Sequence, residues 1–170
     1  AQVLRLSLDG SERTKPVTPA ADDPLRLEDE TLAPAVPAPP GLLHVSALAM
    51  GMHQHYVEAA PALAVPAGAT LYAWVLVDRE HPPQQLMLQF HAGSWEHRLY
   101  WGASLIGWGN EGSASRWKAA DELPPPGVWT RLVVPARDLG LEGREIGGIA
   151  FTLHGGRTCF GPAGLLSGND

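Results

Sequence analysis

The sequence has few of the residues on which several classes of protein depend. Cys159 is the single cysteine among 170 residues, which excludes an internal disulfide and any zinc site built from several cysteines. Charged residues make up only 18% of the chain, and its net charge is -6. This argues against binding to nucleic acids or anionic membranes, since both require a basic surface. No apolar run approaches the roughly 18 residues that a membrane-spanning helix requires, so no membrane span is expected.

Glycine and proline, by contrast, are abundant, with 19 and 16 residues. Both destabilise helix interiors and here separate short apolar runs, so the sequence predicts short strands joined by turns. A short helix or turn is expected at residues 115–122, and another turn at 136–141. Strands at this spacing predict a sandwich or a barrel. The expected strands cover residues 3–8, 25–27, 42–48, 53–58, 70–78, 85–91, 95–101, 129–134 and 149–154.

The N-terminal part of the chain differs in composition from the rest. Residues 11–24 are polar and contain proline, and residues 33–40 hold four prolines, a density that does not suit a central strand. This second segment is expected to cross the surface in an extended, polyproline-like form. We predict an N-terminal strand and polar linker over residues 1–24 and a β-sandwich over residues 25–170, in a single globular domain overall.

Alternate side chains in four of the expected strands fall into two contrasting sets. One set is apolar and forms the predicted core, as with Leu71 and Val75 or Leu88 and Phe90. The other set combines aromatic rings with hydrogen-bonding groups, where an ordinary solvent-facing surface would carry lysine, glutamate, threonine and serine. These candidate ligand-binding residues are Tyr72, Trp74, Gln89, His91, Trp129, Arg131, Thr152 and His154.

The mixed set suits a carbohydrate ligand, because aromatic planes stack on pyranose rings while arginine, glutamine and histidine bond to hydroxyls. Two other interpretations stay open: a polar layer covered by the proline-rich N-terminal segment, and a protein-partner surface anchored by tryptophan, tyrosine and arginine. Trp108 and Trp117 join the candidates because they occupy loop-like sequence. Trp95 is expected to point into the core. Glu96 and Arg98 share a strand face, where an exposed charge pair would contribute little.

Two groups of residues have the chemistry of metal ligands. His53 and His55 lie on one side of an expected strand, with a carboxylate shortly after them, as at the start of a cupin metal site. No second motif completes such a site, so histidines bonded to the backbone are the preferred interpretation. Glu28 and Asp29 could offer oxygen ligands to calcium. A solvated acidic loop without an ion is the preferred interpretation of these residues. We therefore expect no cofactor, with calcium as the alternative.

Several segments resemble a module of large bacterial multidomain proteins, found in planctomycete surface or secreted proteins and in Rhs-type repeat proteins. The segments are His53-Gln54-His55-Tyr56, Trp108-Gly109, and residues 82–89, 95–102, 123–124, 127–136 and 148–153. The resemblance covers about residues 25–164 and implies a jelly-roll sandwich of the galactose-binding or carbohydrate-binding-module type. Such modules often hold a structural calcium between their first and last strands. Cys159-Phe160 stands where the pattern ends in Trp-Asp, which argues against that ion here.

These features predict an all-β, antiparallel two-sheet β-sandwich (jelly roll) of seven to nine strands. They also predict a non-catalytic binding module, possessing no nucleophile elbow or phosphate loop, accessory to a larger bacterial protein. Its expected partner is a glycan. The alternatives are a docking domain that packs against a neighbouring protein domain, and a cupin-like metalloprotein using His53 and His55. No charged-then-apolar leader opens the sequence, so we expect a signal peptide to be absent or already removed. A secreted or cell-surface setting is favoured over a cytoplasmic one.

Overall fold

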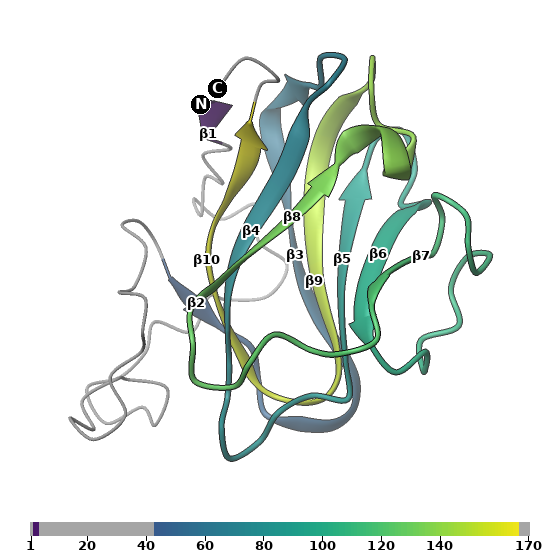
Figure 1. The fold of residues 1–170 in the computed structure, drawn as a ribbon. Coiled ribbons are helices and arrows are strands. Elements are labelled where there is room, and N and C mark those ends of the chain that lie inside the picture. The colour runs from purple at the N-terminus through teal and green to yellow at the C-terminus, as the bar shows by residue number, and fades with distance from the viewer. Residues whose placement is uncertain (1, 4–42, 167–170) are drawn as a thin grey trace.

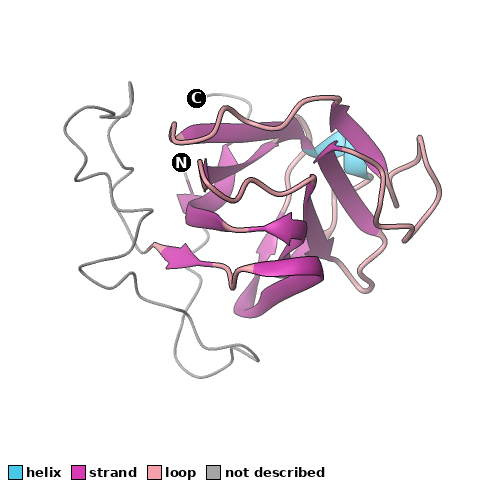
Figure 2. Ribbon diagram, turned by 90° about the horizontal axis from the view of Figure 1, so that it is seen from below, coloured by secondary structure: helices cyan, strands magenta, loops and turns pink. Residues whose placement is uncertain are grey.

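The computed structural model describes residues 2–3 and 43–166, which form two five-stranded sheets facing one another (Figure 1). Figure 2 shows how little of the described chain is helical, with the 3₁₀ helix η2 (Ala136–Leu139) as the one helical element of that part. No helix in the described ranges is long and apolar enough to span a membrane. The strands are β1 (Gln2–Val3), β2 (His44–Val45), β3 (Ala49–Ala64), β4 (Thr70–Val77), β5 (Gln85–His91), β6 (His97–Gly102), β7 (Trp117–Ala120), β8 (Thr130–Pro135), β9 (Glu145–Gly156) and β10 (Thr158–Leu166).

The strand order is that of a jelly roll. Sheet A has the order β1-β10-β4-β8, with β2 also pairing to β10, and sheet B has the order β3-β9-β5-β6-β7. Without β1 and β7, the strands interleave as β2-β10-β4-β8 facing β3-β9-β5-β6, so the chain passes repeatedly from one sheet to the other. All neighbours are antiparallel except β6 and β7, which are parallel. The predicted all-β sandwich is thus confirmed.

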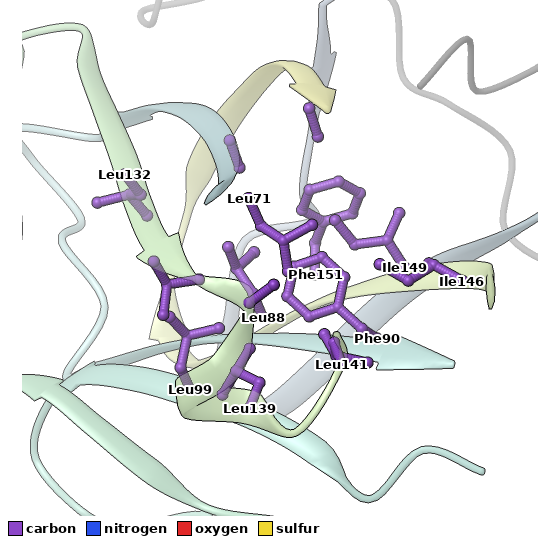
Figure 3. Close-up of a cluster of buried hydrophobic side chains, with 14 of the residues drawn as sticks. Leu71, Leu88, Phe90, Leu99, Leu132, Leu139, Leu141, Ile146, Ile149 and Phe151 are labelled. Carbon is purple, nitrogen blue, oxygen red and sulfur yellow. The ribbon is translucent and has the colours of Figure 1, made fainter. Parts of the chain in front are cut away.

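The core lies between the two sheets, where side chains of one parity meet (Figure 3). In β4, Leu71, Ala73 and Val75 are buried, whereas Tyr72 and Trp74 between them are only half buried. Leu88 of β5 and Phe151 of β9 approach them from sheet B. This alternation is the pattern expected of strands with one face on the core, and it makes the other face of each sheet available for other contacts.

Several local predictions were wrong or lie outside the described residues. Residues 115–122 contain the strand β7 where a short helix or turn was expected, and β10 was not predicted, so residues 2–3 and 43–166 alone form ten strands where seven to nine were expected. Gly161 and Pro162 interrupt the apolar pattern of β10, and a register shift between Phe160 and Ala163 accommodates them. The expected strand 3–8 is described only at its first residue, and the strand 25–27, the segment 33–40 and the proposed boundary at residue 24 lie outside the described residues.

Candidate functional site

The eight predicted strand residues occupy two opposite outer faces, not one. Gln89, His91, Thr152 and His154 belong to β5 and β9 of sheet B. The others belong to sheet A: Tyr72 and Trp74 are on β4, Arg131 is on β8 opposite Trp74, and Trp129 immediately precedes β8. The mixed set of side chains is therefore divided between two faces, because parity within a strand does not say to which sheet that strand belongs.

The outer face of sheet A carries a separate cluster of buried apolar side chains. Trp129 is buried there with Leu76 and Cys159, and Trp74 packs against this cluster from one side. The Tyr72 ring lies over Gly164, where a Cβ atom would come within 2.8 Å of the tyrosine hydroxyl. Tyr72, Trp74 and Trp129 thus serve packing on this face.

The outer face of sheet B is hollowed by a pocket of about 460 Å³. Its floor consists of side chains from neighbouring strands, with Gln54 from β3, Ala150 from β9, Gln89 from β5 and Arg98 from β6. Aromatic rings complete its wall. The lining residues are Gln54, Tyr56, Gln89, Trp95, Arg98, Trp108 and Ala150.

A chain of hydrogen bonds orients the polar floor. Gln89 Nε2 donates to Thr152 Oγ1 at 2.8 Å and to Gln54 Oε1 at 3.1 Å, while Thr152 Oγ1 donates to Gln54 Oε1 at 3.0 Å. Arg98 Nε donates to Gln89 Oε1 at 2.8 Å. Because each member is bonded to the next, the polar groups are held in place before any ligand arrives.

Arg98 is also the link between this floor and its surroundings. Its Nη1 and Nη2 atoms donate to both carboxylate oxygens of Glu96, at 3.0 and 2.9 Å, and Nη1 donates to the carbonyl of Ser115 at 3.1 Å. Its guanidinium carbon lies 5.9 Å from the centroid of the Trp108 ring. The hydrogen bonds from Arg98 hold the pKa of Glu96 below its usual value, so this carboxyl group is ionised at neutral pH.

One aromatic wall is built around Trp95, in the turn between β5 and β6. Its ring meets Tyr56 edge-on at 5.9 Å and His91 at 5.1 Å. The ring lies so close to β9 that a Cβ atom on Gly148 would come within 3.2 Å of Trp95 Cη2. The absence of a side chain at Gly148 therefore allows the indole to lie against the sheet.

The other wall is Trp108, held by a loop that folds back over sheet B. Gln85 Oε1 accepts hydrogen bonds from the backbone N–H groups of Leu105 and Ile106, at 2.7 and 2.8 Å. The Tyr100 hydroxyl donates to Glu111 at 2.6 Å, which contributes to the lowered pKa of Glu111. Ile106 packs on Met87 and Tyr100. These contacts fix the loop on the same face as the floor, so the pocket is formed in the free protein.

Trp108 and Trp117 have different environments despite their similar exposure, 36% and 38%. Trp108 lines the pocket, whereas Trp117 is absent from its lining. Trp117 is the first residue of β7 and pairs with Leu99, whose side chain points into the core. Because paired residues point to the same side of a sheet, Trp117 lies on the face of sheet B opposite to that of Arg98.

Five lining residues were not among the sequence candidates: Gln54, Tyr56, Trp95, Arg98 and Ala150. Gln54 and Tyr56 alternate with His53 and His55, so their parity was a usable signal. Trp95 was assigned to the core by parity, but it precedes β6 and its ring lies on the outer face. The Glu96–Arg98 pair was expected to contribute little if it was exposed; Glu96 is exposed, but Arg98 is buried.

The two candidate histidine ligands, His53 and His55, belong to no metal-binding group within the described chain. His55 packs against His44, Phe151 and Phe160 between the sheets. His53 bonds through Nδ1 to the carbonyl of Gly51 at 3.1 Å. Over residues 2–3 and 43–166, no three histidine, cysteine or acidic residues are arranged to hold an ion. Glu28 and Asp29 lie outside this part of the chain, so the calcium alternative stays a prediction.

Comparison with known proteins finds a likeness to solved structures. No family model matches the chain, and no curated protein matches it. A crystal structure described as the Spr0440 glycoside hydrolase domain, Endo-D, from Streptococcus pneumoniae R6 has a TM-score of 0.43 and 15% identity. The match covers 75% of this chain but only 18% of the hydrolase chain. The prediction that the chain is not an enzyme is corrected on this finding, since a solved structure that it matches is a hydrolase domain.

Proposed function

We propose that this protein binds a saccharide in the pocket on the outer face of sheet B. The observation that carries the proposal is the pairing of a hydrogen-bonded polar floor with aromatic walls on both sides. Gln54 and Gln89 present amide groups from adjacent parts of the floor, and Trp95 and Trp108 stand beside them. The pocket thus combines flat apolar rings with hydrogen-bond donors and acceptors among its lining residues.

A sugar ring matches these two kinds of group at once. Its C–H faces can lie on an indole, and its hydroxyls can exchange hydrogen bonds with amide groups that are already oriented. Binding sites with few, well-placed polar groups among apolar walls are typical of small-molecule ligands. A floor that is rigid beforehand also supports binding, because little side-chain freedom is lost when the ligand arrives. Jelly-roll sandwiches also occur among lectins.

Replacing Trp108 with alanine is expected to weaken saccharide binding by at least about tenfold, because truncating a tryptophan hot spot costs about 2 kcal/mol or more and about 1.4 kcal/mol corresponds to a factor of ten. The measurement is native affinity electrophoresis through gels that contain neutral polysaccharides with free C6 hydroxyls, among them glucans, mannans and galactans. The wild-type protein should be retarded by at least one polymer, and Trp108→Ala should migrate nearly as it does in a gel without polymer.

Trp117→Ala is the matched control, because it removes the same side chain from a similarly exposed position on the same sheet. This variant should keep the retardation of the wild-type protein. The proposal fails if no polymer retards the wild-type protein, or if Trp108→Ala and Trp117→Ala reduce retardation equally. Melting curves of both variants, expected to lie close to that of the wild type, separate loss of binding from loss of fold.

A further inference from the structure

The charge of the pocket comes from a single side chain. Among the described lining residues, Arg98 alone has a charged side chain. The others are glutamines, aromatic residues and one alanine. An unpaired arginine in such a place would favour carboxylate or sulfate groups on a ligand, because a guanidinium binds planar anions with two parallel hydrogen bonds. The ligand's charge therefore depends on what Arg98 already binds.

Arg98 has little capacity left for an anion. A guanidinium has five N–H groups, and four hydrogen bonds from Arg98 go to Gln89, Glu96 and Ser115. Glu96 takes two of them in the paired geometry that a ligand carboxylate would otherwise use. The positive charge is thus cancelled at short range by a carboxylate from the same strand segment.

Glu96 is also the exposed end of this ion pair, since its side chain is 57% exposed and that of Arg98 only 7%. An acidic saccharide would therefore meet the carboxylate and not the guanidinium, and the chain as a whole carries a net charge of -6. Like charges in close contact oppose binding. We infer that the pocket selects uncharged saccharides and that Glu96 is the residue that excludes acidic ones. This inference rests on the proposed function.

The test uses matched polymers that differ in charge. Each neutral polysaccharide that retards the wild-type protein is compared with its derivative oxidised at C6 to the uronate, and with the methyl ester of that uronate. We expect the wild-type protein to bind the uronate at least about tenfold more weakly than the methyl ester. Its affinity for the neutral polymer should stay constant between low and high salt, since no net charge is neutralised on binding.

Glu96→Gln should reverse this preference by freeing the charge of Arg98 while keeping the shape of the side chain. The variant is expected to gain at least about tenfold in affinity for the uronate, and the gain should disappear at high salt. Glu145→Gln removes one negative charge from β9 at a point five residues, roughly 16 Å, from Ala150, and should leave the preference unchanged. It controls for the change in net charge.

The two proposals fail in different ways. If the wild-type protein binds none of the polymers, both fall. If it binds the neutral polymer and the uronate equally, or if Glu96→Gln leaves their ratio unchanged, charge selection is wrong although saccharide binding stands. Should Glu96→Gln not fold, the wild-type comparison of uronate with methyl ester decides the matter alone.

Discussion

Lowering the pH from 7 to 5 is expected to destabilise the protein by about 4 kcal/mol through two histidines that lie between the sheets, His44 and His55. His44 comes from sheet A and His55 from sheet B, and their ring centroids are 4.6 Å apart in the interior. Burial, and then the neighbouring His55, lowers the pKa of His44 to about 3. Burial, and then His53, lowers the pKa of His55 to about 4.

The direction follows from where the protons bind. Between pH 6.5 and about 4, the unfolded chain protonates both side chains, whereas the folded chain keeps them neutral. Acid therefore favours the unfolded state, and the full stability is present only above pH 6.5. At pH 5 each histidine contributes a loss of about 2 kcal/mol. In the fold, moreover, neither Nε2 atom has a hydrogen-bond acceptor that would stabilise an imidazolium.

Urea denaturation at a series of pH values measures this effect. His44→Phe should remove about half of the loss between pH 7 and pH 5, because phenylalanine keeps a ring in the cluster with Phe151 and Phe160 but binds no proton. A wild-type protein whose free energy of unfolding is the same at pH 7 and pH 5 would contradict the assignment. So would a His44→Phe variant with an unchanged pH dependence.

Replacing Asp78 with alanine is expected to destabilise the fold by about 3–5 kcal/mol, since it removes one partner of a buried ion pair. Asp78 Oδ2 accepts a hydrogen bond from Arg157 Nε at 2.8 Å, and the two side chains are only 3% and 15% exposed. Asp78 Oδ1 accepts from the backbone N–H groups of Glu80 and His81. The residue therefore ties the turn after β4 to the turn between β9 and β10.

Asp78→Asn separates these two roles. The amide oxygen can still accept from the turn, but the charge opposite Arg157 is lost, so we expect a destabilisation smaller than that of Asp78→Ala. The midpoint of urea unfolding, at unchanged slope, gives both values. A loss below 1 kcal/mol for Asp78→Ala would show that the ion pair contributes no more than an exposed one.

Alternation of apolar residues was enough to predict the sandwich and its core. Leu71, Val75, Leu88 and Phe90 were assigned to one buried face from parity alone, and all four are buried between the sheets. A strand at the boundary of the core must place its apolar side chains on one face. Whether a residue is apolar or polar therefore indicates to which face its side chain points.

The pocket could be predicted only in part, because it depends on which strands are neighbours. Gln89 was identified from its parity, but its contact with Gln54 joins residues 35 positions apart. Trp95 lies in a turn, where parity says nothing about direction, and its place against the sheet depends on Gly148 of another strand. Likewise, nothing within the strand sequences themselves separates Trp74 of sheet A from the residues of sheet B.

The central claim is that the outer face of sheet B, and not that of sheet A, binds the saccharide. The six tryptophans give separate indole N–H signals in a two-dimensional nitrogen–proton NMR spectrum, so one titration with an oligosaccharide of the retarding polymer reports on both faces. We predict that the signals of Trp95 and Trp108 shift with the ligand while those of Trp74 and Trp129 do not. Shifts confined to Trp74 and Trp129, or no shift at saturating saccharide, would contradict the account.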